Sequence, residues 1–140
     1  MKKNKFNNFT IFGSRGFFGS NLVKYLKKNK NKVFTPNTKK FIFKKNLGNV
    51  IYCIGTHQAS KDPDKALDGN LNILSKVLLN NKFQTFTYLS SIRVYSSNKK
   101  TNEEANIITD NKEKDIYFKT LKLAAENLCL QSNNPRIKIV

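Results

Sequence analysis

The chain has 140 residues, of which 39% are hydrophobic, and a formal net charge of +17. This length is enough for one domain with a sizeable core, and the discrete apolar runs exclude a disordered chain. No apolar run approaches the roughly 18 residues that span a bilayer, and residues 1–8 are too polar for a signal peptide. We therefore expect one cytoplasmic domain over residues 1–140.

The positive charge is almost entirely lysine interleaved with asparagine, as at residues 27–32, and only three residues are arginine: Arg15, Arg93 and Arg136. The sequence shows no arginine-rich stripe and no aromatic ladder of the kind found in base-stacking modules. We therefore expect neither nucleic acid nor a membrane as partner. A nucleic-acid binder would require the positive charge to be gathered on one face.

The first part of the chain predicts a strand, a glycine-rich turn and a helix. Asn8–Phe12 is a short apolar run, and apolar residues recur at helical spacing over Phe17–Asn29. Lys32–Thr35 is a second short strand that Pro36 ends. From there to Asn49 there is room for little more than a loop and the run 41–43, so this part of the fold is shortened.

The second part continues the alternation of strands and helices. Val50–Ile54 is a continuous apolar run, as expected for a strand buried on both faces, and leucines form a stripe along the predicted helix Asp64–Asn80. The remaining predicted elements are a strand over Thr85–Leu89, a loop over 96–114, a helix over 115–131 and a strand over 135–140. This order predicts an α/β fold: a Rossmann-type doubly wound parallel sheet with 9–12 beside 50–54 at its centre.

Two cysteines, Cys53 and Cys129, both lie inside apolar runs. Buried reduced thiols are the expected state of both. No cluster of cysteine and histidine exists in the sequence, so we expect no metal site.

The loop Gly13–Gly19 is the candidate phosphate site. Its residues are Gly13, Ser14, Arg15, Gly16, Phe17, Phe18 and Gly19, between the first strand and the first helix. Glycine allows the tight turn, the close approach of a pyrophosphate and the packing of helix on strand, and the helix N-terminus attracts anions. A glycine triplet is a weak signal by itself, but this one has the right neighbours. We expect NAD(P) as the cofactor.

The second strand suggests which dinucleotide binds. An acidic residue that grips the ribose hydroxyl is expected at its end, but the sequence there, residues 33–40, contains no aspartate or glutamate. Arg15 lies where a 2′-phosphate would be. NADP is therefore slightly favoured over NAD, although Arg15 and Lys39 also fit ordinary solvated charges.

Four motifs in order resemble the extended branch of the short-chain dehydrogenase/reductases, the nucleotide-sugar epimerases and dehydratases. Besides the glycine loop these are Asn49–Gly55, with Tyr52 where many members carry histidine, the segment Leu89–Tyr95 and the helix segment Lys122–Glu126. The strand 135–140 would lead to a substrate domain, which this chain lacks. We expect the chain to be the N-terminal part of a longer protein.

The resemblance implies hydride transfer at a sugar carbon of a nucleotide-sugar. In this family a tyrosine is the acid/base, a lysine lowers its pKa and holds the ribose, and a serine binds the substrate hydroxyl. Carried over, Ser91 is the serine and Lys122 the lysine, whereas Ser90 is structural. Cofactor contacts are implied for Cys53, Ile54 and Gly55. The resemblance also implies a possible homodimer through the helices near 64–80 and 115–131.

The tyrosine is where this sequence departs from the family spacing of Tyr-x-x-x-Lys. Four residues before Lys122 is Phe118, whereas Tyr117 is five before it, about 140° away around a regular helix. We predict that Tyr117 faces Ser91 through an irregular first turn or a π-type bulge. The alternative is that Tyr117 packs on the core face near Leu121.

Two functions remain open at this point. The first is an epimerase- or dehydratase-like enzyme, for which this piece alone is expected to be inactive. The second is a non-catalytic NAD(P)-binding protein or inactive fragment with a displaced tyrosine–lysine pair. His57, just past the strand at 50–54, is expected to be an ordinary loop residue rather than a contact to the cofactor or substrate.

Overall fold

The structure is a computed structural model that describes residues 8–38, 46–56, 59–80, 82–96, 102 and 104–140. Strands and helices alternate along the chain, as the sequence predicts. The elements are β1 (Asn8–Phe12), α1 (Phe17–Lys28), β2 (Lys32–Phe34), β3 (Asn49–Tyr52), α2 (Pro63–Leu67), the π-helical segment η2 (Asp68–Asn72), α3 (Ile73–Asn80), β4 (Thr85–Tyr88), the 3-10 turn η3 (Ile92–Tyr95), α4 (Ile116–Gln131) and β5 (Ile137–Ile139).

The strands form one five-stranded sheet in the order β2-β1-β3-β4-β5, and every pair is parallel. β1 and β3 are adjacent at its centre, with Thr10 opposite Val50 and Phe12 opposite Tyr52. This confirms the predicted parallel sheet and its central pair. The run at 41–43 lies outside the described residues, and no α-helix or strand occurs in the described parts of 35–48.

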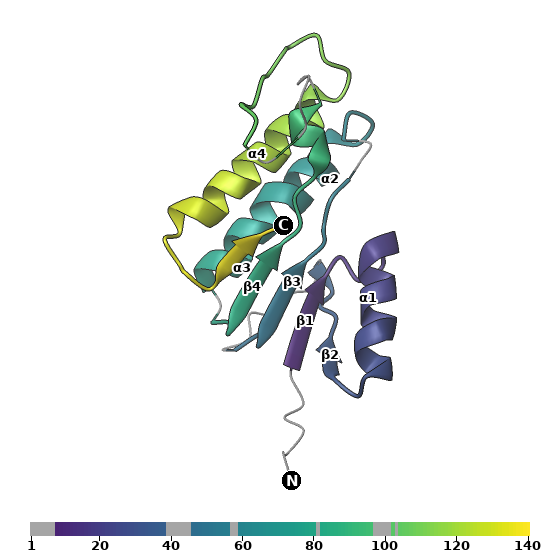
Figure 1. Ribbon diagram of the computed structural model, residues 1–140. Helices are drawn as coiled ribbons and strands as arrows, with labels where there is room; N and C mark the ends of the chain where they lie inside the picture. The colour runs from purple at the N-terminus through teal and green to yellow at the C-terminus, as the bar shows by residue number, and fades with distance from the viewer. Residues whose placement is uncertain (1–7, 39–45, 57–58, 81, 97–101, 103) are drawn as a thin grey trace.

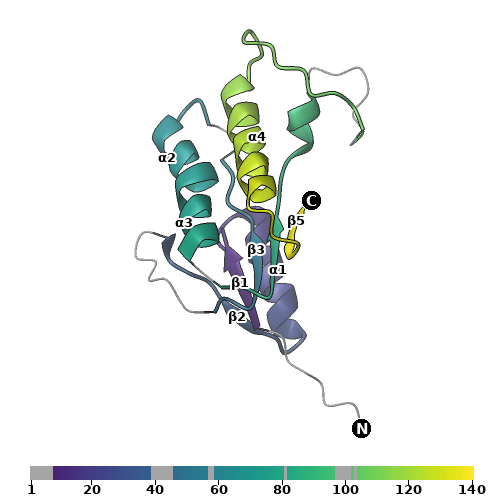
Figure 2. The same ribbon diagram turned by 90° about the vertical axis from the view of Figure 1, so that its left-hand side faces the viewer.

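Helices lie on both sides of the sheet, as in a doubly wound fold. Figures 1 and 2 show α1 on one side and α2, α3 and α4 on the other. The strand order reverses at β1, because the chain goes outward to β2 and then returns to β3. In open α/β sheets, ligands bind at such a switch point, outside the carboxyl ends of the strands.

The side of the sheet under α3 and α4 carries the larger core. Its centre is Tyr52, fully buried, whose ring lies 5.5 Å from that of Phe12, 6.2 Å from that of Phe86 and 6.1 Å from that of Tyr88. The opposite side of β3 and β4 is only half-buried, at Ile51 and Thr87. The expectation that the strand at 50–54 is buried on both faces is therefore wrong for one face, since among the described helices only α1 lies on that side.

The predicted helix over 64–80 is interrupted by the π-helical turn η2. Leu74 of the predicted leucine stripe is fully buried, whereas Leu67, before the turn, is 39% exposed and Asn70 is buried within the turn. Two contacts explain the position of the turn. Tyr52 donates its hydroxyl proton to the carbonyl of Gly69, and a Cβ at Gly69 would lie 2.7 Å from the Ile54 side chain.

None of the described helices is long and apolar enough to cross a membrane. Both cysteines are free thiols. Cys129 is buried under α4, as expected, but Cys53 is only half-buried because it follows β3 at the carboxyl edge of the sheet.

Candidate functional site

The glycine loop turns sharply between β1 and α1. Gly13 has φ of +83°, which side-chain-bearing residues rarely adopt, and a Cβ there would lie 2.8 Å from the carbonyl carbon of Cys53. A Cβ at Gly19 would lie 2.4 Å from the Gly13 oxygen. These two glycines therefore let the loop close against the end of β3 and let α1 start against the loop.

Gly16 differs from the other two glycines of the loop. A Cβ at Gly16 would meet one atom, the Gly13 oxygen, at an ordinary distance of 3.4 Å. Gly16 is the N-cap residue of α1 and is exposed. No side-chain hydrogen bond caps this end of the helix. The loop therefore has open space at its middle glycine, where the backbone of a dinucleotide can approach closely.

The first turn of α1 offers the phosphates unpaired donors. The first N–H groups of a helix have no intrahelical acceptor, and the aligned peptide dipoles place partial positive charge there. The first turn of α1 contains no acidic residue that would compete with an anion. The loop and helix together therefore fit the diphosphate of NAD(P).

Lys122 of α4 extends across the carboxyl ends of β3 and β4. Its ammonium donates a hydrogen bond to the Leu89 carbonyl over 2.9 Å and lies 4.8 Å from the centre of the Tyr88 ring. A Cβ at Gly55 would lie 3.3 Å from Lys122 Nζ. Because Gly13 also touches Cys53, the glycine loop, the end of β3 and Lys122 form one continuous surface.

Lys122 is buried, with 3% of its surface exposed. Desolvation lowers its pKa from 10.5 to about 8, and the opposing effects of Glu126 and Cys53 are smaller. Burial also raises the pKa of the Cys53 thiol to about 11. The site thus holds a cation that is easily deprotonated beside a thiol that is not reactive at neutral pH.

Of the two aromatic residues at the start of α4, Phe118 and not Tyr117 lies on the side of Lys122. The Phe118 ring centre lies 6.0 Å from Lys122 Nζ and 5.7 Å from the guanidinium carbon of Arg93. Phe118 is buried, with 6% exposed. The π-type turn that we expected near Tyr117 occurs instead at 68–72, and α4 is a regular helix from Ile116.

Tyr117 points to the neighbouring helix α2. Its hydroxyl donates to the Pro63 carbonyl over 3.1 Å, and its ring packs against the small cluster of Ala59, Ala66, Phe118 and Leu121. The predicted orientation of Tyr117 toward Ser91 is therefore wrong. In a regular helix successive residues are rotated by about 100°, so residues 118 and 122, four apart, lie on the same face. Residue 117 lies on a different face.

Ser90 and Ser91 follow β4 and have different surroundings. Ser90 donates its hydroxyl proton to Glu126 and its N–H to the Val140 carbonyl, so it joins β4, α4 and the end of the chain. The Ser91 hydroxyl accepts a hydrogen bond from the N–H of Arg93 over 3.3 Å and caps η3. Both serines line an open groove together with Glu126 and Val140.

The predictions from the sequence also concern the end of β2, Arg15 and His57. Phe34 ends β2 half-buried, and the described residues 35–38 contain no acidic side chain. Arg15 is exposed in the glycine loop. Lys39 and His57 lie outside the described residues.

Sequence reasoning missed two contributors to this site. The Leu89 carbonyl accepts a hydrogen bond from the ammonium of Lys122, and Gly69 lets the π-helical turn reach Ile54. Gly69 inside a helical pattern was a visible signal of close packing. Backbone acceptors such as Leu89 carry no sequence signal.

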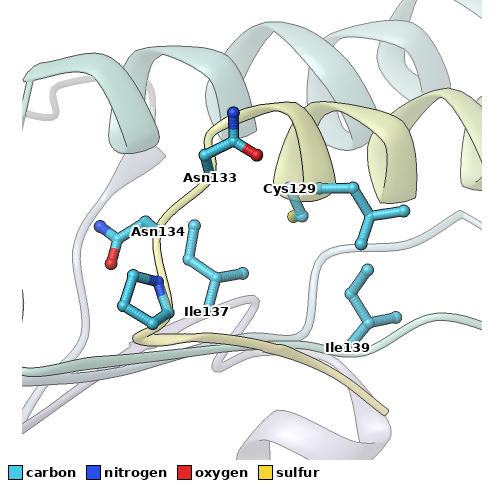
Figure 3. Close-up of a pocket in the computed structure, with 7 residues that line it drawn as sticks. Cys129, Asn133, Asn134, Ile137 and Ile139 are labelled. Carbon is cyan, nitrogen blue, oxygen red and sulfur yellow. The ribbon is translucent and has the colours of Figure 1, made fainter.

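A second hollow lies away from this site. Figure 3 shows it between the end of α4 and β5, with Cys129, Ile137 and Ile139 along its walls. It is lined by residues before and within β5, toward the amino edge of the sheet, and no charged residue lines it. The hollow therefore lacks groups that would bind a phosphate.

Comparison with known proteins identifies relatives by structure only. No protein-family model and no curated protein matches the sequence. Among solved structures, a UDP-glucuronic acid 4-epimerase from Bacillus cereus in complex with NAD and a UDP-sugar analogue matches at a TM-score of 0.70 and 17% identity. The match covers 94% of this chain and 55% of that chain.

Two further solved structures agree. A short-chain dehydrogenase/reductase superfamily protein from Agrobacterium tumefaciens with bound NAD matches at a TM-score of 0.72 and 15% identity, over 94% of this chain and 47% of that chain. RMD from Pseudomonas aeruginosa in complex with NADPH matches at a TM-score of 0.64 and 22% identity, over 94% of this chain and 52% of that chain. The chain therefore has a Rossmann-type fold. More narrowly, it is the fold seen in short-chain dehydrogenase/reductases and nucleotide-sugar epimerases, and the chain spans about half of their length.

Proposed function

We propose that the chain binds NAD(P), with the diphosphate on the loop Gly13–Gly19 and Lys122 beside the nicotinamide-side ribose. The observation that carries this proposal is the continuous surface from Gly16 through Gly55 to the buried ammonium of Lys122. Cys53 and Ile54 supply the backbone that lies against Gly13. The solved structures of similar fold that hold NAD or NADPH support the same assignment.

The preferred form of the cofactor is NADP. The described residues after β2 lack the acidic side chain that would repel a 2′-phosphate, and the exposed Arg15 stands at the loop that receives the adenosine half. Arg15 would pair with that phosphate as a charge-assisted hydrogen-bond donor.

Titration with both reduced cofactors tests the binding and the preference. Cofactor fluorescence should show that NADPH binds more tightly than NADH. Arg15→Ala should weaken the binding of NADPH by about tenfold and leave the affinity for NADH unchanged. Arg136→Ala, at an arginine near β5, is the matched control and should change neither affinity. Absence of binding by both cofactors would refute the site, and tighter NADH binding that Arg15→Ala leaves unaltered would refute the preference.

The chemistry proposed for the whole protein is hydride transfer on a nucleotide-sugar, of the epimerase or dehydratase kind. Ser91 at the end of β4 is proposed to bind the substrate hydroxyl, in the groove that also contains Glu126. The similar structures that contain UDP-sugars support this substrate class. A homodimer through the surfaces of α3 and α4 is part of the same proposal.

One observation favours a second candidate, a non-catalytic NAD(P)-binding protein. Phe118 occupies the position over Lys122 and has no ionisable hydroxyl, whereas Tyr117 donates to Pro63 of α2. With these contacts the chain binds the cofactor but does not hold an acid/base tyrosine beside the nicotinamide. The two candidates differ in whether the full-length protein turns over substrate without a hydroxyl at position 118.

A further inference from the structure

The charges of the chain are distributed very unevenly. Residues 1–61 contain 14 lysine and arginine residues and no aspartate or glutamate, whereas residues 62–140 contain the other 12 basic residues and all nine acidic ones. A general bias toward lysine and asparagine does not account for the absence of acidic residues from one part only. Residues 1–61 therefore carry +14 of the net charge of +17, and six of these basic residues lie in the β1–α1–β2 part.

Five of these lysines lie close together in the fold. Lys24, Lys27 and Lys28 of α1 are exposed, and Lys30 and Lys32 continue the surface through the turn into β2. We call these five lysines together with Tyr25 the basic α1 face. Figure 1 shows α1 and β2 at one edge of the molecule, with no other described element outside α1.

An aromatic ring lies among these lysines. Tyr25 is 65% exposed, and it is the only large hydrophobic side chain so exposed between residues 19 and 32. Residues 21, 24, 25 and 28 share one side of the helix because they are three or four positions apart. The basic α1 face therefore presents cations around one free ring.

The basic α1 face is distinct from the cofactor site. Lys28 ends a helix of 12 residues whose other end begins at the glycine loop, which is a length of about 18 Å. Charges more than about 8–10 Å apart are largely screened at physiological salt. These lysines therefore cannot serve mainly to attract the cofactor phosphates.

We propose that the basic α1 face binds single-stranded RNA, a function separate from the binding of NAD(P). Proteins that bind single strands without sequence preference combine a positive surface for the backbone with aromatic rings on which bases stack. A membrane surface would need a broad apolar band beside the lysines. On α1 Leu26 is 6% exposed against the sheet, and the exposed Phe17 and Phe18 lie in the first turn, at the glycine loop rather than among the lysines.

Anisotropy of a fluorescent uridine oligoribonucleotide, measured over a range of salt concentrations, tests the proposal. Binding of RNA should fall steeply with salt, and replacing Lys24, Lys27 and Lys28 with glutamine should reduce the slope of log K against log salt by about 2, or about 0.7 per lysine. Tyr25→Ala should weaken binding at least about fivefold, through lost base stacking. The control replaces the exposed Lys76, Lys112 and Lys138 with glutamine, removes the same charge and should leave the slope unchanged.

A second variant separates binding from folding. Lys30 has φ of +59°, a conformation that asparagine adopts more readily than lysine. Lys30→Asn should therefore weaken RNA binding while the protein becomes no less stable to urea. Three results would each overturn the proposal. The control triple variant could lose as much RNA affinity as the α1 variant, NADPH could displace the RNA, or the protein could bind phosphatidylserine vesicles without binding RNA.

Discussion

The glycine loop and the start of α4 both lie at the carboxyl edge of the sheet, but they differ in how well their residues fit the functions proposed for them. At the loop, Gly13 and Gly19 make contacts that a Cβ would prevent, and Gly16 has open space. At α4, Lys122 points into the same site, but Phe118 rather than a tyrosine lies over it. The comparison teaches that the proposed cofactor binding and the proposed proton transfer depend on separate parts of the structure.

The largest expected effect comes from restoring the missing hydroxyl. In the full-length protein, Phe118→Tyr should raise the rate of hydride transfer from UDP-glucuronic acid to NADP⁺ by about 10²–10⁴-fold, which is the typical contribution of a positioned acid/base. Absorbance at 340 nm measures it. Tyr117→Phe is the matched control, because its hydroxyl donates to Pro63, and it should change nothing. Turnover in the unaltered chain that Tyr117→Phe abolishes would contradict the assignment.

A smaller effect distinguishes the glycines within the loop. Gly19→Val should destabilise the fold by about 2–4 kcal/mol, because its Cβ would lie 2.4 Å from the Gly13 oxygen. Gly16→Ala should leave the urea midpoint nearly unchanged but weaken NADPH binding more than about tenfold, since its methyl group would enter the space proposed for the diphosphate. Unchanged NADPH affinity in Gly16→Ala would place the diphosphate elsewhere.

The smallest expected effect concerns Lys122. Its folded pKa of about 8 is below the unfolded value of 10.5, so the unfolded chain holds the proton more tightly and stability rises between about pH 8 and pH 10.5. Lys122→Met should remove this rise and stabilise the protein at pH 7 by about 1–2 kcal/mol, after the loss of the hydrogen bond to Leu89.

Urea unfolding at pH 7 and pH 9.5 measures this change, with the exposed Lys76→Met as control. The same Lys122→Met variant should bind NADPH more weakly. A variant that is less stable at pH 7, with the pH dependence unaltered, would show that Lys122 contributes to folding rather than to a functional site.

Local sequence rules predicted the elements that depend on neighbours in the chain. Gly13–Gly19 and the apolar run of β1 are such features, and the parallel sheet follows from their order. The face of each helix was harder to predict. The π-helical turn at 68–72 exists because Tyr52 and Ile54 of a distant strand contact Gly69, and no periodicity within the helix shows that.

The position of Tyr117 could not be predicted for the same reason. Whether α4 starts with a regular turn depends on its contacts with α2 and with the loop before it, not on residues 115–122 themselves. Lys122 was predicted from the resemblance of the segment Lys122–Glu126 to a family helix, but its acceptor, the carbonyl of Leu89 just after β4, was not.

Three sets of contacts fix the rotation of α4 about its axis. Tyr117 donates to Pro63, Asp115 pairs with Arg93 over 3.3 Å, and the buried Lys119 binds Glu113 and the Ile108 carbonyl. Turning the helix to bring Tyr117 to Lys122 would break all of these at once. In evolutionary terms the shorter route between a binding protein and a catalyst is therefore a change at codon 118. Phenylalanine and tyrosine codons differ at one base, so a single-nucleotide change is enough. Moving the existing tyrosine to Lys122 would require several simultaneous substitutions.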